Sequence, residues 1–313
     1  MRLAVIDLGT NTFHLLIVDL KGEDFSVVYR EKTAVRIGKD GISEGRITPE
    51  AQQRAIKALK RFKEVINIHE TEEISATATS AIRNAENGLD LVREIHKATG
   101  ISVRIIDGLQ EATYIYNGVK KALNIGPDPA LVMDIGGGSI EFIIGNQQKI
   151  FWKRSFEIGG QRLIDRFHAL DPISTKEQSE LVNYLREALL ALKEVTGKYN
   201  VQTLIGSSGT FDTLSDIYCV KNGLEKDLTA TEYPLEFEEF KVIVEDIISK
   251  TRAERLQIPG MIEMRVDMIV VAVILVKFVV GLLGISDIRV SAYALKEGVL
   301  LNAIEQIRSK TIR

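Results

Sequence analysis

The chain is poor in cysteine and proline and has no excess of charge of either sign, and each shortage excludes a class of protein. A single cysteine among 313 residues, Cys219, excludes an internal disulfide and a zinc site built from several thiolates, and it fits a reducing cytoplasmic environment. Only 6 prolines beside a hydrophobic share of 45% exclude a disordered or fibrous chain. The balance of 40 basic and 43 acidic residues argues against a nucleic-acid-binding protein, which usually carries a basic domain.

Long hydrophobic runs are also scarce. One run, residues 268–285, has the length of a short membrane span, but Lys277 interrupts it and Arg265 lies just before it. We therefore expect a buried helix between two domains rather than a membrane helix. The apolar N-terminus contains Asp7 and no small-residue cleavage site follows, so we expect no signal peptide.

A series of strands and helices begins twice along the chain. Apolar runs predict strands at residues 3–6, 13–20, 25–29, 73–77, 101–106, 130–133, 140–144, 149–156, 202–205 and 288–290. Helical spacing predicts helices at residues 49–66, 87–99, 110–123, 160–167, 175–196, 213–220, 237–249, 264–283 and 293–307. Turns are expected at residues 21–24 and, most strongly, at 124–129. The second turn predicts a first domain of residues 1–125 and a second of 126–313, whose last helix packs back on the first.

The two domain starts repeat one pattern. In residues 4–16 and again in 131–143, an apolar strand ends in aspartate, at Asp7 and at Asp134. A glycine lies two places on, a hydroxyl residue five places on, and a second apolar strand follows. Repeats indicate architecture before any single motif does, so both copies are predicted to be hairpins with polar, glycine-bearing tips.

The composition of each tip indicates phosphate binding. Glycine lets backbone N–H groups approach an anion closely, and the hydroxyls add donors. The two aspartates would repel phosphate unless a divalent cation lies between them. A single such hairpin would be read as a tight turn with a capping aspartate, and the second copy favours the phosphate site. The candidate phosphate-binding residues are Asp7, Gly9, Thr10, Asn11, Thr12, Gly136, Gly137, Gly138 and Ser139.

Five segments together resemble one family, the exopolyphosphatase / guanosine pentaphosphate phosphohydrolase (Ppx/GppA) family of the actin, sugar-kinase and heat-shock chaperone ATPase superfamily. They are DLGTNTFH at residues 7–14, ATSAIRNAEN at 78–87, QEA at 110–112, DIGGGSIE at 134–141 and GSSGT at 206–210. The resemblance implies an α/β protein with two ribonuclease-H-like, actin-like ATPase domains, whose mixed sheets face each other across a central cleft. The chain resembles the short form of the family, which lacks the extra C-terminal helical domain of longer members. This implies weaker binding of long polyphosphate.

The resemblance places the general base at Glu111, the glutamate of a Glu-Ala pair. Phosphoanhydride hydrolysis needs a positioned water and charge neutralisation more than covalent chemistry. The alternative is a first-turn glutamate stabilised by the helix dipole. The preceding residue, often acidic in the family, is Gln110 here.

The resemblance also implies a metal site at Asp134 and Glu141, seven residues apart across the second hairpin tip. Mg²⁺ prefers oxygen ligands and shares them with substrate phosphates, and other divalent cations would use the same ligands. The alternative for Glu141 is an outward-facing strand residue. His14, its equivalent in the first copy, has no second histidine or cysteine spaced to join it, so we expect a polar or phosphate contact there.

Two further segments complete the predicted substrate site. The resemblance implies that Arg83, in a polar loop after a strand, binds substrate phosphate, which its guanidinium could do as a bidentate fork; the alternative is a solvated surface arginine. A third phosphate-binding loop is predicted between a strand and a helix, with a nucleotide, a distal phosphate or nothing as its ligand. Its residues are Gly206, Ser207, Ser208, Gly209 and Thr210.

With the family resemblance, these residues predict a cytoplasmic Mg²⁺-dependent hydrolase that releases orthophosphate from the end of inorganic polyphosphate. Three alternatives stay open: hydrolysis of the 5′-terminal phosphate of guanosine pentaphosphate (pppGpp), a non-catalytic polyphosphate or nucleotide sensor, and an ATP-dependent kinase of the same superfamily. The family implies a homodimer, and neither nucleic acid nor membrane is an expected partner. Ten basic and four acidic residues between Arg30 and Lys63 are expected to form a solvated face that helps steer a polyanion.

Overall fold

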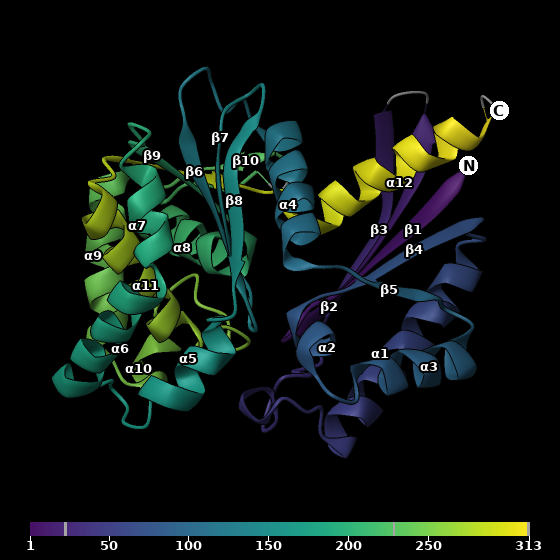
Figure 1. Ribbon diagram of the computed structural model, residues 1–313, viewed down its shortest axis with the longest axis horizontal. Coiled ribbons are helices and arrows are strands. Elements are labelled where there is room, and N and C mark those ends of the chain that lie inside the picture. Colours follow the sequence, from purple (N-terminus) through teal and green to yellow (C-terminus); the bar gives the residue numbers. More distant parts are fainter. Residues whose placement is uncertain (22–23, 228, 312–313) are drawn as a thin grey trace. The chain divides into compact units, whose positions relative to one another are not determined.

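The computed structural model describes residues 1–21, 24–227 and 229–311, and it divides into two compact units (Figure 1). Unit 1 comprises Met1–Gly118, Gly136–Gly138 and Leu295–Arg313. Unit 2 comprises Val119–Ile135 and Ser139–Ala294. The turn predicted at residues 21–24 includes residues 22 and 23, which lie outside the described residues.

Unit 1 is built on a five-stranded sheet in the order β3-β2-β1-β4-β5. The strands are β1 (Arg2–Leu8), β2 (Thr12–Lys21), β3 (Asp24–Ala34), β4 (Glu73–Ala78) and β5 (Val103–Ile105). The first three form an antiparallel meander, whereas β4 runs parallel to β1 and β5 parallel to β4. The sheet is therefore mixed, and the tip between β1 and β2 is the first predicted hairpin tip.

Helices cover both faces of this sheet (Figure 1). They are α1 (Pro49–Ile68), α2 (Ser80–Asn84), α3 (Gly88–Thr99) and α12 (Leu295–Thr311), with a 3₁₀ turn at Ile42–Glu44. A further helix, α4 (Gly108–Ala122), begins in unit 1 and ends in unit 2. Alternate residues of β1, among them Ile6, join the core that also contains α1 and α3. Their neighbours, such as Val5, are buried too, and α12 packs against β1 and β4. Both faces of β1 are covered, which explains why its residues 3–6 are continuously apolar.

Unit 2 repeats this topology and adds an edge strand, β10, which runs antiparallel to β11. Its sheet has the order β10-β11-β9-β6-β7-β8. The strands are β6 (Ala130–Ile135), β7 (Ile140–Gly145), β8 (Ile150–Phe156), β9 (Thr203–Ser207), β10 (Glu232–Tyr233) and β11 (Asp287–Ser291). The meander β6-β7-β8 corresponds to β1-β2-β3, and the parallel strands β9 and β11 correspond to β4 and β5. The predicted fold class, α/β with two ribonuclease-H-like mixed sheets, is confirmed.

Seven helices are described in unit 2: α5 (Gly160–Phe167), α6 (Thr175–Ala188), α7 (Leu190–Thr196), α8 (Ser208–Lys221), α9 (Phe237–Ser249), α10 (Arg252–Arg255) and α11 (Ile269–Leu283). The apolar α11 is the predicted buried helix, but it packs within unit 2 against α9, α5 and α6 rather than between two domains. In the part of the chain that the structure describes, no helix is both long and apolar enough to cross a membrane.

Three local predictions were wrong. The helix predicted over residues 175–196 is two helices, which meet at Leu189. The segment around Arg83, predicted as a loop, forms the short helix α2. No loop separates β9 from α8, because the strand ends at Ser207 and the helix begins at Ser208.

Candidate active site

The tip of the first hairpin in unit 1 is held in place by backbone hydrogen bonds. The Gly9 N–H donates to the Thr12 carbonyl at 3.2 Å, and a Cβ at Gly9 would lie only 2.9 Å from that oxygen. The carbonyls of Thr10 and Asn11 accept N–H groups from the segment that follows β3. The tip therefore has a fixed backbone, as a preformed phosphate-binding loop requires.

A row of polar side chains crosses the sheet of unit 1 below this tip. Asp7 pairs in register with His14 on β2 and with Thr77 on β4, and His14 pairs with Lys32 on β3. Residues directly opposite on neighbouring strands share one face of a sheet. The row thus contains one carboxylate, a histidine and a lysine. Such a set of side chains suits phosphate binding better than metal binding. Lys32 was not predicted as a site residue, because only the register of β3 brings it to this row.

Arg83 and Glu111 form a buried ion pair in unit 1. The Arg83 Nη1 donates to Glu111 Oε2 at 2.7 Å and to the carbonyl of Ile106 at 3.1 Å. Their side chains are only 14% and 7% exposed. The structure therefore joins the predicted general base to the predicted phosphate-binding arginine, and neither is a solvated surface residue.

Glu111 lies in the first turn of α4, as the helix-dipole alternative also required. Asp107 begins the helix, accepting the N–H of Gln110 on its Oδ1 at 2.7 Å. The neighbouring Gln110 side chain donates to the hydroxyl of Tyr114 at 3.0 Å. A first-turn position explains why Glu111 is tolerated there, but it does not explain its burial against Arg83.

In unit 2 the corresponding row is Ser207–Asp134–Glu141–Ser155, across β9, β6, β7 and β8. Asp134 and Glu141 are 6% and 1% exposed. The hydroxyl of Ser207 donates to Asp134 Oδ2 at 2.7 Å, and that of Ser155 to Glu141 Oε1 at 2.6 Å. Glu141 is thus not an outward-facing strand residue.

The residues predicted to form the third loop, which instead end β9 and begin α8, lie in the same region of unit 2. The Ser208 hydroxyl also donates to Asp134 Oδ2, at 2.6 Å. A Cβ at Gly209 would lie 1.8 Å from Nη2 of Arg265, so only glycine allows that arginine to approach the start of α8. The hydroxyl of Thr210 is buried, and within the described residues its oxygen has no hydrogen-bond partner.

Arg265 is a site residue that the sequence did not single out. Its side chain is buried, and within the described residues its Nε has no hydrogen-bond partner. Burial lowers the pKa of Arg265 below its ordinary value, an effect opposed by the carboxylates of Asp212 and Asp134. A buried guanidinium beside the start of α8 is suited to binding an anion. Arg265 lies shortly before the apolar helix α11. No sequence motif marks this position.

The two buried carboxylates of unit 2, Asp134 and Glu141, suit a cation whose other ligands are water molecules and substrate phosphates. Among the described residues there is no group of three or more histidine, cysteine, aspartate or glutamate side chains that could hold a metal. Mg²⁺ is usually bound through one or two carboxylates, with waters and substrate phosphates completing its coordination. Asp134 and Glu141 fit this mode and do not fit a structural metal site.

Four of the remaining predicted residues, Gly136–Ser139, occupy the second hairpin tip, between β6 and β7. Gly136–Gly138 group with unit 1, and the buried Ser139 begins the return to β7 in unit 2. Gly206 lies in β9, where a Cβ would lie 2.0 Å from the ring of Phe211. A glycine at position 206 is thus required for β9 to pack against α8.

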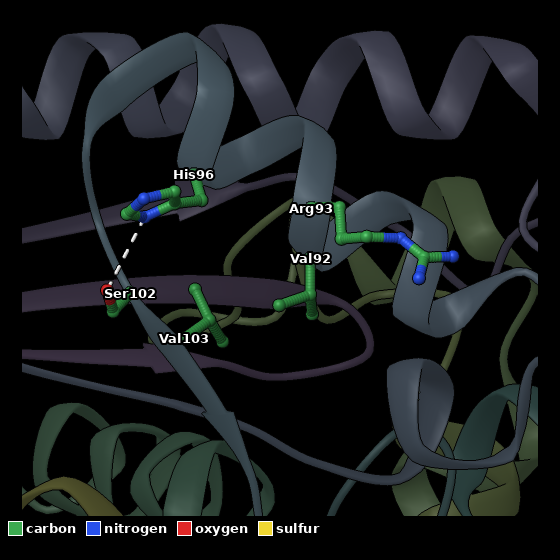
Figure 2. A pocket seen from close by; sticks show the side chains of 5 residues that line it. All are labelled: Val92, Arg93, His96, Ser102 and Val103. Atoms are coloured by element: carbon green, nitrogen blue, oxygen red, sulfur yellow. Dashed lines mark hydrogen bonds between the residues drawn. The ribbon is translucent and has the colours of Figure 1, made fainter.

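Two open concavities lie elsewhere in unit 1. One, of about 470 Å³, is lined by Val92, Arg93 and His96 of α3 together with Ser102 and Val103 (Figure 2). Figure 2 shows His96 pointing to Ser102, with 3.4 Å between Nδ1 and Oγ. The other, of about 410 Å³, includes Lys60 and Lys63 of α1 and Lys97 of α3. Neither contains a predicted site residue.

The repeated mixed sheets, each with an aspartate-bearing hairpin, define an α/β protein with two ribonuclease-H-like domains of the actin-like ATPase class. Comparison with known proteins narrows this class. The chain belongs to the Ppx/GppA phosphatase family, whose model matches residues 16–307. It is accordingly an enzyme that hydrolyses phosphoanhydrides.

Two solved structures illustrate the similarity. An exopolyphosphatase from Cytophaga hutchinsonii is 44% identical, with 98% of each chain covered and a TM-score of 0.94. The Ppx/GppA family member from Aquifex aeolicus is 26% identical, again with 98% of each chain covered, and has a TM-score of 0.80. The family resemblance inferred from the five sequence segments is confirmed.

Proposed function

We propose that this chain is an exopolyphosphatase, which hydrolyses the terminal phosphoanhydride of inorganic polyphosphate in a Mg²⁺-dependent reaction and releases orthophosphate. The observation that carries the chemistry is the buried Arg83–Glu111 pair, with 2.7 Å between Nη1 and Oε2. The choice of polyphosphate is supported by the 44% identity to an exopolyphosphatase over 98% of both chains.

In this proposal Glu111 is the general base. Its carboxylate accepts a proton from the attacking water while Arg83 fixes its orientation. A guanidinium carries five N–H donors in a planar fork, so Arg83 can contact a phosphate oxygen as well as Glu111. Phosphoryl transfer depends mainly on positioning and on charge stabilisation, and this pair provides both.

Asp134 and Glu141 would hold Mg²⁺, which when bound supplies positive charge against the phosphate oxygens. The hairpin tips at residues 9–12 and 136–139 would bind phosphate through backbone N–H groups and through the hydroxyls of Thr10, Thr12 and Ser139. Gly209, with Arg265 beside it, and Thr210 would bind a further phosphate of the chain. Asp7, in the unit 1 row with His14 and Lys32, lies under the first tip.

The competing substrate is pppGpp, whose terminal phosphoanhydride has the same chemistry. A head-to-head measurement of orthophosphate release from polyphosphate and from pppGpp, both with Mg²⁺ and without an acceptor, tests the proposal. We expect a higher kcat/KM for polyphosphate. A higher value for pppGpp would make this chain a pppGpp phosphohydrolase. Binding without release would make it a sensor, and release only with an acceptor would make it a kinase.

The family resemblance also leads us to propose a homodimer, and the single cysteine a cytoplasmic location. Light scattering coupled to size-exclusion chromatography would measure the mass in solution. A mass close to twice 34.9 kDa is expected, and a mass close to 34.9 kDa would contradict the dimer.

A further inference from the structure

Each of the two buried carboxylates of unit 2 is held by serine hydroxyls. Ser207 and Ser208 both donate to Asp134 Oδ2, at 2.7 and 2.6 Å. On the other side of the row, Ser155 donates to Glu141 Oε1 at 2.6 Å. The same arrangement of a carboxylate with a hydroxyl on the neighbouring strand thus occurs twice in one row.

These bonds follow from strand register. Ser207 is the in-register partner of Asp134 on β9, and Ser155 is the in-register partner of Glu141 on β8. Strand partners leave little freedom in where two side chains meet. Each carboxylate is therefore oriented by a group on a strand that the sheet itself holds fixed.

Ser208 adds an observation independent of register. Its backbone has φ +69°, in the left-handed region that residues other than glycine rarely adopt. Glycine would adopt this conformation without strain, yet the residue here carries a hydroxyl, and that hydroxyl reaches Asp134. Strain that persists in this way often marks a side chain with a function.

We propose that Ser155, Ser207 and Ser208 are positioning residues, which fix the orientation of the Asp134 and Glu141 carboxylates for a divalent cation. This inference rests on the proposed metal site. It also distinguishes two parts of the start of α8: the serine hydroxyls act on Asp134, whereas substrate binding is proposed for Gly209 and Thr210. Hydrogen-bond partners of metal ligands typically change metal affinity by about 10–100-fold when removed.

The test measures metal binding without substrate. Mn²⁺ is titrated into the protein, and the unbound ion is followed by electron paramagnetic resonance. The wild-type protein should bind Mn²⁺, and Asp134→Asn should bind it much more weakly. Ser208→Ala and Ser208→Gly should both weaken binding by about 10–100-fold. Because glycine relieves the strain at φ +69°, Ser208→Gly should also melt at a higher temperature than Ser208→Ala.

Ser155 provides a matched pair. Ser155→Ala removes the hydroxyl and should weaken Mn²⁺ binding, whereas Ser155→Thr keeps a hydroxyl, suits a strand and should restore binding. Wild-type affinity in Ser155→Ala and in both Ser208 variants, with binding lost in Asp134→Asn, would overturn the inference while leaving the metal site intact. No Mn²⁺ binding by the wild-type protein would overturn the metal site and, with it, this inference.

Discussion

The two buried carboxylates Asp134 and Glu141 lie opposite each other, an arrangement that does not stabilise the folded protein. They are in-register partners on adjacent strands, and both are buried. Like charges directly opposite each other destabilise a sheet, and burial adds the cost of removing charge from water. Serine hydroxyls and the nearby charge of Arg265 offset part of this cost. A bound cation would offset the rest, which makes the pair costly for folding and useful for binding.

Asp134→Asn is the prediction that follows at the residue scale. The amide removes one negative charge and weakens the metal site, so turnover should fall and should be partly restored by raising the Mg²⁺ concentration. Mg²⁺ should raise the Tm of the wild-type protein by mass action and that of the variant much less. Turnover and Tm are both measured across a Mg²⁺ titration. A variant with wild-type Mg²⁺ dependence would show that Asp134 is not a metal ligand.

At the scale of elements, the repeated strand order could be predicted from the sequence, whereas several boundaries could not. Both copies of the hairpin carry their own signal, an apolar run ending in aspartate with glycine two places on. The helix α2 has only five residues, too few to show a helical period, so the sequence predicts a loop around Arg83. The break at Leu189 has no sequence signal either, because leucine is a good helix former.

Some residues of the candidate site could likewise be predicted from the sequence, and others could not. The sequence segments predicted Glu111 and Arg83 separately, but only the fold shows that they form an ion pair. Likewise Ser155 and Lys32 enter their rows through strand register, which depends on long-range pairing and not on any local motif. Arg265 is brought to Gly209 by the packing of the segment before α11. These residues could not be identified without the structure.

Two glycines in helix interiors give opposite predictions. A Cβ at Gly298 of α12 would lie 1.8 Å from the Tyr114 carbonyl of α4, so Gly298→Ala should destabilise unit 1 by about 1–3 kcal/mol through overpacking. Gly281 of α11 is exposed, with open space around the position of its Cβ, so Gly281→Ala should stabilise unit 2 by about 0.5–1 kcal/mol. Denaturant unfolding of both variants measures this. Equal effects would contradict the close approach of α12 to α4.

The segment after α5 should make stability depend on pH. Burial, with the charge of Arg255 nearby, lowers the pKa of His168 in the folded protein, although Asp171, Glu177 and Asp267 oppose this. The unfolded chain, with an ordinary pKa of about 6.5, then binds the proton more readily. The contribution of His168 is therefore fully present above about pH 6.5 and is lost as the pH falls below it.

His168→Gln cannot be protonated, so its Tm should vary less between about pH 7 and pH 5 than that of the wild-type protein. His96→Gln, which replaces an exposed histidine of α3 in the same way, is the matched control. Thermal unfolding across this pH range measures both variants. Identical slopes for His168→Gln and the wild-type protein would exclude His168 as the source of the pH dependence.

At the scale of the whole molecule, a chain with net charge −3 must attract a polyanion through local positive charge. Lys60 and Lys97 line a concavity on α1 and α3. The double variant Lys60→Glu/Lys97→Glu should lower kcat/KM for polyphosphate by about 3–10-fold at low salt, with kcat unchanged. The difference should vanish near 0.5 M salt, where screening is strong, with a Debye length of only about 4–5 Å.

Lys176→Glu/Lys193→Glu, on α6 and α7, is the matched control because it changes the net charge equally on exposed helices of unit 2. Steady-state kinetics at several salt concentrations compare the two double variants. If both lower kcat/KM equally, net charge and not the position of these lysines governs capture of the substrate.

The most direct test of the account is the turnover of Glu111→Gln. Glutamine keeps the shape of the side chain and an oxygen that can accept from Arg83, but it cannot take the proton of the attacking water. A general base typically contributes about 10²–10⁴-fold in rate. We expect orthophosphate release from polyphosphate to fall by that factor while polyphosphate binding persists. The exposed Glu94→Gln on α3 should retain full activity. Near-wild-type turnover in a folded Glu111→Gln would contradict the assignment of Glu111 as the base.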